Sequence, residues 1–214
     1  MEFLLPLLTV AAVQLLAVIS PGQSFIVISR LALSAGRPPA IAAAVGMGVG
    51  SIIWASSAIL GLALILEQAV WLYALLKIAG GAYLLYLAIR LWRHAAEPLD
   101  LPGGGNGAMS MRSAFVLGLL TQLANPKVAV FFGSIFFALL PAHAPAWVYA
   151  ASVTIVFWNE TLWYSAVSVV FSNRRSRMLY LEAKVWIDRV MGLALGTIGA
   201  KLIADAFTAA PKQN

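Results

Sequence analysis

The sequence predicts an all-α integral membrane protein with six transmembrane helices arranged as a 3+3 inverted repeat. Three observations support this fold class. The chain is 62% hydrophobic and only 10% charged, whereas soluble domains usually carry about 25% charged residues. Its apolar residues form six long, continuous stretches. A glycine-rich segment separates the first three stretches from the last three.

Each apolar stretch is long enough for one membrane helix, which needs about 20 residues. The first stretch exceeds the length of a signal-peptide core, and Met1-Glu2 lacks basic residues, so we expect no cleavable signal. The six helices are expected at residues 3–29, 40–66, 70–92, 113–140, 146–171 and 189–209.

The net charge of +6 is explained by the loops, so we expect no nucleic-acid partner. Ten of the fourteen Lys and Arg residues fall in or beside the first, third and fifth loops, and the second and fourth loops carry none. Basic loops remain in the cytoplasm, which places both termini outside. The ten residues are Arg30, Arg37, Arg90, Arg93, Arg112, Arg174, Arg175, Arg177, Lys184 and Arg189.

The chain divides into two halves within a single membrane domain. Residues 1–92 are expected to form the first three-helix repeat, 93–112 a cytoplasmic linker, and 113–214 the second repeat. Because each half has an odd number of helices, the second half must be inverted relative to the first. The glycine run at 103–107 lacks the Gly-Lys-Ser/Thr sequence and the preceding strand of a phosphate-binding loop.

Two helix-start signals lie inside apolar stretches. Ser20-Pro21-Gly22-Gln23 and Asn125-Pro126-Lys127 each place an N-cap residue before a proline at the first helical position. Ser20 and Gln23 also fit a capping box. We therefore expect helices 1 and 4 to be interrupted at Pro21 and Pro126, which would act as hinges beside a polar cavity. Prolines that merely kink the helices are the alternative.

Four helices place polar features at a similar depth. With a rise of about 1.5 Å per residue, Pro21, Ser51, Asn125 and Glu160 lie roughly 21 to 27 Å from the outer ends of their helices. Glu160 is the single acid well inside a predicted span, where a charge costs on the order of 3 kcal/mol. We expect it to carry a coupling proton or to bind a substrate ammonium. The alternative is a structural carboxyl, hydrogen-bonded to Asn159 or a tyrosine.

Lys127 lies in the first turn of a restarted helix, where its charge opposes the helix dipole. Local stability therefore does not explain it. A bound carboxylate would satisfy Lys127 together with the nearby helix N–H groups. A permanent ion pair with Glu160 is the alternative.

Other chemistry is poorly supported. The absence of cysteine excludes thiol chemistry, and His94 and His143 are too far apart in sequence to indicate a metal site. No serine–histidine or paired-aspartate arrangement lies within the spans. We predict neither an enzyme nor a bound cofactor or metal.

The motifs, in order and spacing, resemble the six-helix amino-acid exporters of bacteria that are grouped with the lysine and the homoserine/threonine exporters. The likeness covers nearly the whole chain. It is carried by Ser20-Pro21-Gly22 with Phe25-Ile26-Val27, Gly36-Arg37, Ala79-Gly80-Gly81-Ala82-Tyr83-Leu84-Leu85-Tyr86-Leu87, Asn125-Pro126-Lys127 with Phe131-Phe132, Trp163-Tyr164 and Asp188-Arg189-Val190-Met191-Gly192. The resemblance implies export of amino acids or similar small metabolites from the cytoplasm, in exchange for protons.

The chain departs from the family pattern at two acidic positions. Gln23-Ser24 stands where members similar to this one often have Pro-Asp or Pro-Asn, and Ser51 replaces an aspartate common after the glycines of helix 2. Loss of both acids leaves Glu160 as the carboxyl candidate for proton coupling. Uncharged Ser24 and Ser51 would suit a neutral amino acid better than a cationic one.

We therefore predict a secondary transporter of the bacterial cytoplasmic membrane that works by proton antiport and alternating access. A passive channel or a non-transporting membrane scaffold is the alternative. The expected partners are an amino-acid substrate, protons and lipid; the substrate's identity and the oligomeric state, a homo-oligomer included, are left open. The candidate substrate-binding residues are Ser20, Gly22, Gln23, Ser24, Ser51, Asn125, Pro126, Lys127, Asn159 and Trp163, with Glu160 for proton coupling.

Overall fold

The computed structural model describes residues 3–68, 70–97, 109–140 and 144–208. All regular elements in these residues are helices, which confirms the all-α class. The predicted linker at 93–112 falls largely on residues 98–108, outside the described residues. The helices are α1 (Leu4–Ile19), α2 (Gln23–Ser34), α3 (Arg37–Gln68), α4 (Val70–His94), α5 (Met111–Leu123), α6 (Pro126–Leu139), α7 (Ala146–Phe171) and α8 (Arg174–Thr208).

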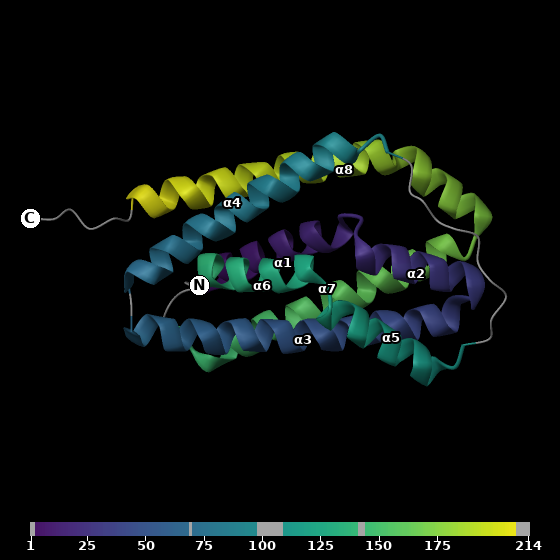
Figure 1. Ribbon diagram of the computed structural model, residues 1–214, viewed down its shortest axis with the longest axis horizontal. Coiled ribbons are helices and arrows are strands. Elements are labelled where there is room, and N and C mark those ends of the chain that lie inside the picture. The colour runs from purple at the N-terminus through teal and green to yellow at the C-terminus, as the bar shows by residue number, and fades with distance from the viewer. Residues whose placement is uncertain (1–2, 69, 98–108, 141–143, 209–214) are drawn as a thin grey trace, which may run out of the picture.

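The helices form an elongated bundle (Figure 1). Helices α4 and α8 lie side by side along one edge, and the shorter α1 and α6 lie in the middle. Helix α3 packs along α5 and α7 on the opposite side. The start of α1 and the end of α8 lie toward the same end of the bundle, on the left in Figure 1.

Two described segments, in α3 and α8, are long and apolar enough to cross a membrane. The number rises to four if the bent pairs α1–α2 and α5–α6 each form one span. Helices α4 and α7 do not meet the same test over the described residues. Six membrane spans therefore stay a prediction.

The pairs α1–α2 and α5–α6 bend by 58° and 59° at breaks of a few residues. At the second break, the Asn125 side chain accepts a hydrogen bond of 3.0 Å from the backbone N–H of Lys127. Pro126 occupies the first helical position, where a missing N–H removes no helical bond. This helix start is fully explained by its local sequence.

The predicted capping box at the first break is wrong. Helix α2 begins at Gln23, its N-cap is Gly22, and no side chain caps it. Gly22 has extended backbone angles of φ −159° and ψ −166°. The backbone is therefore still extended at Gly22 and becomes helical only at Gln23. Ser20 is the C-cap of α1 rather than the N-cap of α2. The N-terminal N–H groups of α2 consequently have no side-chain cap.

The predicted start of the last helix at residue 189 is also wrong. Helix α8 begins at Arg174 and runs for 35 residues, so most of the predicted fifth loop is helical. The side chain of Asn173 accepts hydrogen bonds from the backbone N–H groups of Arg175 and Ser176, at 2.9 and 3.5 Å. Asn is a preferred residue for starting a helix in this way.

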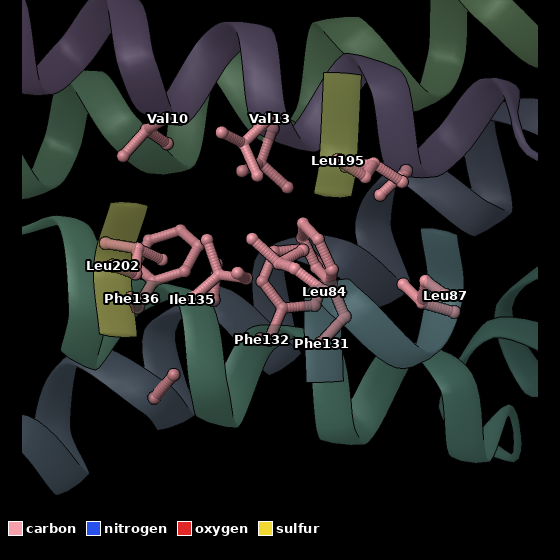
Figure 2. Close-up of a cluster of buried hydrophobic side chains, with 14 of the residues drawn as sticks. Val10, Val13, Leu84, Leu87, Phe131, Phe132, Ile135, Phe136, Leu195 and Leu202 are labelled. Carbon is pink, nitrogen blue, oxygen red and sulfur yellow. The ribbon is translucent and has the colours of Figure 1, made fainter. Parts of the chain in front are cut away.

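Two apolar clusters surround the polar centre of the bundle. The first joins α1, α4, α6 and α8 with parts of α3 and α7. Figure 2 shows Val10 and Val13 opposite the phenylalanines of α6. Three of those side chains, Phe131, Phe132 and Phe136, are 4% exposed or less. The second cluster joins α2, α3 and α7 with the end of α1, the start of α5 and the early part of α8. In it, Tyr180 of α8 stacks on Phe25 with ring centroids 5.5 Å apart.

Glycines allow the closest helix contacts. A Cβ atom on Gly46 would overlap the carbonyl of Phe115, and one on Gly118 would overlap the carbonyl of Ala43. These contacts are reciprocal and bring the backbones of α3 and α5 together, as small residues commonly do in membrane bundles. A similar pair joins α4 to α8, where a Cβ on Gly81 would lie 2.8 Å from the carbonyl of Gly199.

Gly118→Ala is expected to destabilise the protein by about 3 kcal/mol, because the added methyl meets rigid backbone. Gly133→Ala is the matched control, because no atom lies within 4 Å of its Cβ position. Thermal unfolding of both purified variants in detergent measures the difference. A Gly118→Ala protein as stable as the control would contradict the close packing of α3 and α5.

Candidate functional site

An inner cavity lies where the two helix breaks meet the middle of α7. It is partly open: its empty space of about 370 Å³ includes open solvent, and the space that water can enter is about 30 Å³. Polar groups come from the two breaks and from Glu160, while aliphatic and aromatic side chains form the rest of the wall. The lining residues are Ala17, Val18, Ser20, Gly22, Ser24, Asn125, Lys127, Val128, Phe131, Phe132, Glu160 and Tyr164.

A larger cavity, which we call the vestibule, adjoins the inner cavity. Its empty space of about 1340 Å³ includes open solvent, and the space that water can enter is about 530 Å³. Both cavities are lined by Ser20, Gly22, Asn125 and Lys127. The other vestibule residues come from the two breaks, the first half of α6, the second half of α4 with the residues just after it, and the first half of α8. They are Pro21, Gln23, Tyr83, Tyr86, Leu87, Arg90, Leu91, His94, Glu97, Pro126, Val130, Lys184 and Asp188.

Lys127 stands at the boundary of the two cavities. Its ammonium Nζ donates hydrogen bonds to the carbonyls of Ala17, at 3.0 Å, and Ser20, at 3.2 Å. These carbonyls belong to the last turn of α1, the negative end of that helix, where a cation is stabilising. Since an ammonium has three N–H donors, one remains for a ligand.

The C-terminal end of α5 is satisfied in a comparable way. The indole Nε1 of Trp54 donates a hydrogen bond of 3.3 Å to the carbonyl of Gln122. At both breaks, the carbonyls at the end of the preceding helix therefore accept a hydrogen bond from a side chain of another helix. The donor is Lys127 for α1 and Trp54 for α5. Unpaired carbonyls would be costly at membrane depth.

Glu160 is 3% exposed, and its two carboxyl oxygens differ in their partners. Oε1 accepts hydrogen bonds from the amide Nε2 atoms of Gln122, at 3.1 Å, and Gln14, at 3.4 Å. Oε2 is buried and has no hydrogen-bond partner among the described residues. The pair Lys127–Glu160 is not among the ion pairs within 4.0 Å in the described part of the chain.

Gln122 connects Glu160 to both helix breaks. Its Oε1 accepts a bond of 2.9 Å from the hydroxyl of Ser24, and its Nε2 donates a bond of 2.7 Å to Ser51. The amide of Asn125 donates a bond of 3.1 Å to Ser24. Helices α2, α3, α5 and α7 thus meet in one polar network at the inner cavity.

The sequence model of the LysE type translocator family matches residues 15–206. The chain belongs to this family. Its relatives include a threonine efflux protein of Escherichia coli K12, 32% identical over 198 residues that cover 92% of this chain and 96% of the relative. A threonine efflux protein of Salmonella typhimurium is 35% identical over 202 residues, 91% and 96% of the two chains.

Another relative has a name that indicates a different role. The chemotactic transduction protein ChpE of Pseudomonas aeruginosa is 35% identical over 193 residues, which cover 83% of this chain and 91% of the relative. No solved structure matches the chain. Family membership makes the protein a transporter rather than an enzyme.

The structure brings some of the predicted site residues of the translocator together. The inner cavity is lined by Ser20, Gly22, Ser24, Asn125, Lys127 and Glu160. Pro21, Gln23 and Pro126 line the vestibule instead.

Three predicted site residues do not line either cavity. Ser51 lies behind the inner cavity as a partner of Gln122. Asn159 donates to the carbonyl of Ala11, at 3.0 Å, and to Gln14, at 2.6 Å, rather than to Glu160. Trp163 packs against the second apolar cluster. Within the described residues, no group of three His, Asp or Glu side chains is placed to hold a metal ion.

Sequence reasoning missed Gln14 and Gln122, which are 1% and 0% exposed and hold Glu160. Their signal was an amide side chain in the middle of a predicted span, which needs partners there. Reasoning also placed Lys184 in a loop, although it and Asp188 line the vestibule.

Lys184 and Asp188 form a buried ion pair of 2.8 Å, with side chains 8% and 4% exposed. The same ammonium donates to the carbonyls of Ala95, at 2.9 Å, and His94, at 3.4 Å. All three donors of Lys184 are thus used, and they fasten the end of α4 to α8. The vestibule wall depends on this pair.

Lys184→Met is expected to cost about 3 kcal/mol, because it leaves a buried carboxylate unpaired. Lys184→Met with Asp188→Leu should recover much of that loss, since the double variant buries no charge. The measurement is thermal unfolding in detergent of the wild type, the single variant and the double variant. A double variant less stable than the single one would show that the unpaired carboxylate is not the cause of the lost stability.

Proposed function

We propose that the protein exports a small neutral amino acid from the bacterial cytoplasm in exchange for protons, with the substrate bound in the inner cavity, which has to widen to hold it. The observation that carries the proposal is the pair of free polar groups in that cavity. Lys127 has one unused N–H donor, and Glu160 has one unpartnered oxygen. A zwitterion carries the two complementary groups.

The binding arrangement follows from charge. The substrate carboxylate would bind Lys127 and the uncapped N–H groups at the start of α2, a favourable place for an anion. The ammonium would bind Oε2 of Glu160. The nearby Ser24 and Ser51 are uncharged, and Phe131 and Phe132 offer an apolar surface for a small side chain.

The named relatives support amino acids as the substrate class. Two of them are called threonine efflux proteins, and we propose threonine or a similar small amino acid for this chain. The relative named as a chemotactic transduction protein favours a second candidate, a membrane signalling component that binds such a ligand without moving it. Transport and binding therefore have to be measured separately.

We further propose six spans in a 3+3 inverted repeat, with both termini outside and α1–α2 and α5–α6 as broken spans. The nearly equal bends of 58° and 59° support this symmetry. The vestibule is lined by the second half of α4 and the first half of α8, next to the loops predicted to be cytoplasmic. It would then be the cytoplasmic entrance.

The opposite side of the inner cavity is filled by the first apolar cluster, which includes Ile135, Phe136 and Leu202, all 6% exposed or less. We interpret this arrangement as the inward-open state of an alternating-access cycle. Export requires the vestibule to close and this cluster to part, which is the rocking motion expected of inverted repeats.

Cells that express Lys127→Ala are expected to lose selective efflux, because the substrate carboxylate loses its cation. The measurement is release of every amino acid from preloaded cells. Trp54→Phe is the matched control, since it removes the carbonyl partner of the other helix break without lining the inner cavity.

Equal losses in both variants would mean that Lys127 acts only as a helix cap. Unchanged export by Lys127→Ala at equal protein levels would end the proposed binding site. Ligand binding by the wild type without any efflux would favour the signalling candidate.

The absence of cysteine allows a direct test of orientation, because a single introduced cysteine is the only thiol. Gln23 is exposed and lines the vestibule. Gln23→Cys should therefore react with a membrane-impermeant maleimide in inside-out vesicles but not in right-side-out vesicles. Trp147→Cys, at the start of α7 and 56% exposed in the wild type, should show the reverse. The opposite labelling pattern would reject the proposed orientation.

A further inference from the structure

The hydrogen bonds around Glu160 determine which end of each neighbouring amide side chain, the oxygen or the NH₂ group, faces the carboxyl. Ser24 accepts a bond from the amide of Asn125 and uses its own hydroxyl hydrogen toward Oε1 of Gln122. Because that oxygen of Gln122 is an acceptor, the other end of the amide must be the NH₂ group. This NH₂ group donates to Ser51 and to Oε1 of Glu160.

A second chain of bonds fixes Gln14 in the same way. The amide of Asn159 donates to the oxygen of Gln14, at 2.6 Å, and to the backbone carbonyl of Ala11. The NH₂ group of Gln14 is therefore the end that faces Oε1 of Glu160, at 3.4 Å. The two glutamines come from α1 and α5, on different sides of the carboxyl.

Both amide partners of Oε1, those of Gln14 and Gln122, are thus N–H donors, which cannot accept a hydrogen bond. The hydroxyl of Ser51 also lies beside the carboxyl as a hydrogen-bond donor. A proton on Oε1 would point an O–H group at these donors and would break at least one bond inside the buried network, at the cost of an unsatisfied polar group. A proton on Oε2 breaks none, since Oε2 has no partner among the described residues. Oε2 is also the oxygen left for the substrate ammonium.

We propose that Gln14 and Gln122 confine the proton of Glu160 to Oε2, so that a proton and the substrate ammonium compete for one oxygen atom. This inference rests on the proposed function and explains how substrate export would be coupled to proton movement. When the ammonium binds the carboxylate, the O–H bond at Oε2 breaks and one proton leaves to water. The reverse exchange follows substrate release on the other side. Proton and substrate then cross the membrane in alternation.

Two other titratable groups face this cavity. Lys127 of α6 and Tyr164 of α7 line it together with Glu160. Helices α1, α2, α3 and α5 present Gln14, Ser24, Ser51 and Gln122 to the network, none of which titrates. Among the described residues, Glu160 is therefore the carboxyl that lines this cavity.

The first test measures proton release when L-threonine, and then each other amino acid, binds the purified protein in weakly buffered detergent solution. The wild type should release about one proton per bound substrate when Glu160 starts protonated, and its dissociation constant should rise about tenfold for each unit of pH below the titration of Glu160. Glu160→Gln should release none, and its weaker binding should not depend on pH. Glu182→Gln, an exposed carboxyl change on α8, is the control that should behave as wild type.

The second test addresses the two glutamines as positioning residues. In infrared difference spectra, the C=O band of protonated Glu160 should be present in the wild type and absent in Glu160→Gln. In Gln122→Leu it should move to higher wavenumber, because the carbonyl oxygen Oε1 loses a donor. Gln14→Leu should give a smaller shift in the same direction, in line with its longer bond, and serves if Gln122→Leu does not fold.

The outcomes distinguish a failure of the proposed function from a failure of the proposed competition at Oε2. If no amino acid binds, the proposed function fails and the competition with it. Binding without proton release overturns the competition alone and leaves the substrate site intact. An unshifted C=O band in the glutamine variants would show that Oε1 is not the carbonyl oxygen, which overturns the confinement of the proton.

Discussion

The structure depends on how broken helices are satisfied inside a membrane protein. A break exposes carbonyls at one helix end and N–H groups at the next helix start, and lipid offers partners to neither. The carbonyls of α1 receive the ammonium of Lys127, and the carbonyl of Gln122 receives the indole of Trp54. The N–H groups at the start of α2 lack a side-chain cap. Donors that the fold leaves open beside a cavity are what an anionic ligand needs.

This view changes the meaning of Lys127. From the sequence, its charge opposes the dipole of α6, so either a bound carboxylate or an ion pair with Glu160 is needed to explain it. In the folded protein, the same ammonium lies at the favourable end of α1, a helix about one hundred residues earlier in the chain. The lysine thus has a structural role and one spare donor. The structural role could not be recognised without knowing which helix end lies opposite Lys127.

The sequence predicted what local chemistry determines. The helix class follows from the long apolar stretches, and the start of α6 follows from Asn125 and Pro126. The start of α2 was misplaced because Ser20 and Gln23 match a capping pattern, whereas the extended backbone of Gly22 delays the helix.

Partners distant in sequence could not be predicted. Gln122 meets Glu160, Ser24 and Ser51 through side chains 38, 98 and 71 positions away, and an isolated glutamine in an apolar stretch does not reveal which of them it will find. The rule that basic residues mark cytoplasmic loops places Lys184 in a loop. The spacing of four residues between Lys184 and Asp188, which fits a helical ion pair, is the signal that it lies in a helix.

The length of α8 has a consequence for the whole molecule. Thirty-five residues extend roughly 50 Å, against a hydrocarbon core of about 30 Å. The excess includes Arg174 and Arg175, and Trp186 farther along is 70% exposed, a side chain that favours the headgroup region. In the proposed membrane arrangement, sliding this helix along the membrane normal would move charged groups into lipid. The height of α8 in the bilayer would then be fixed while the proposed transport cycle rearranges the other helices around it.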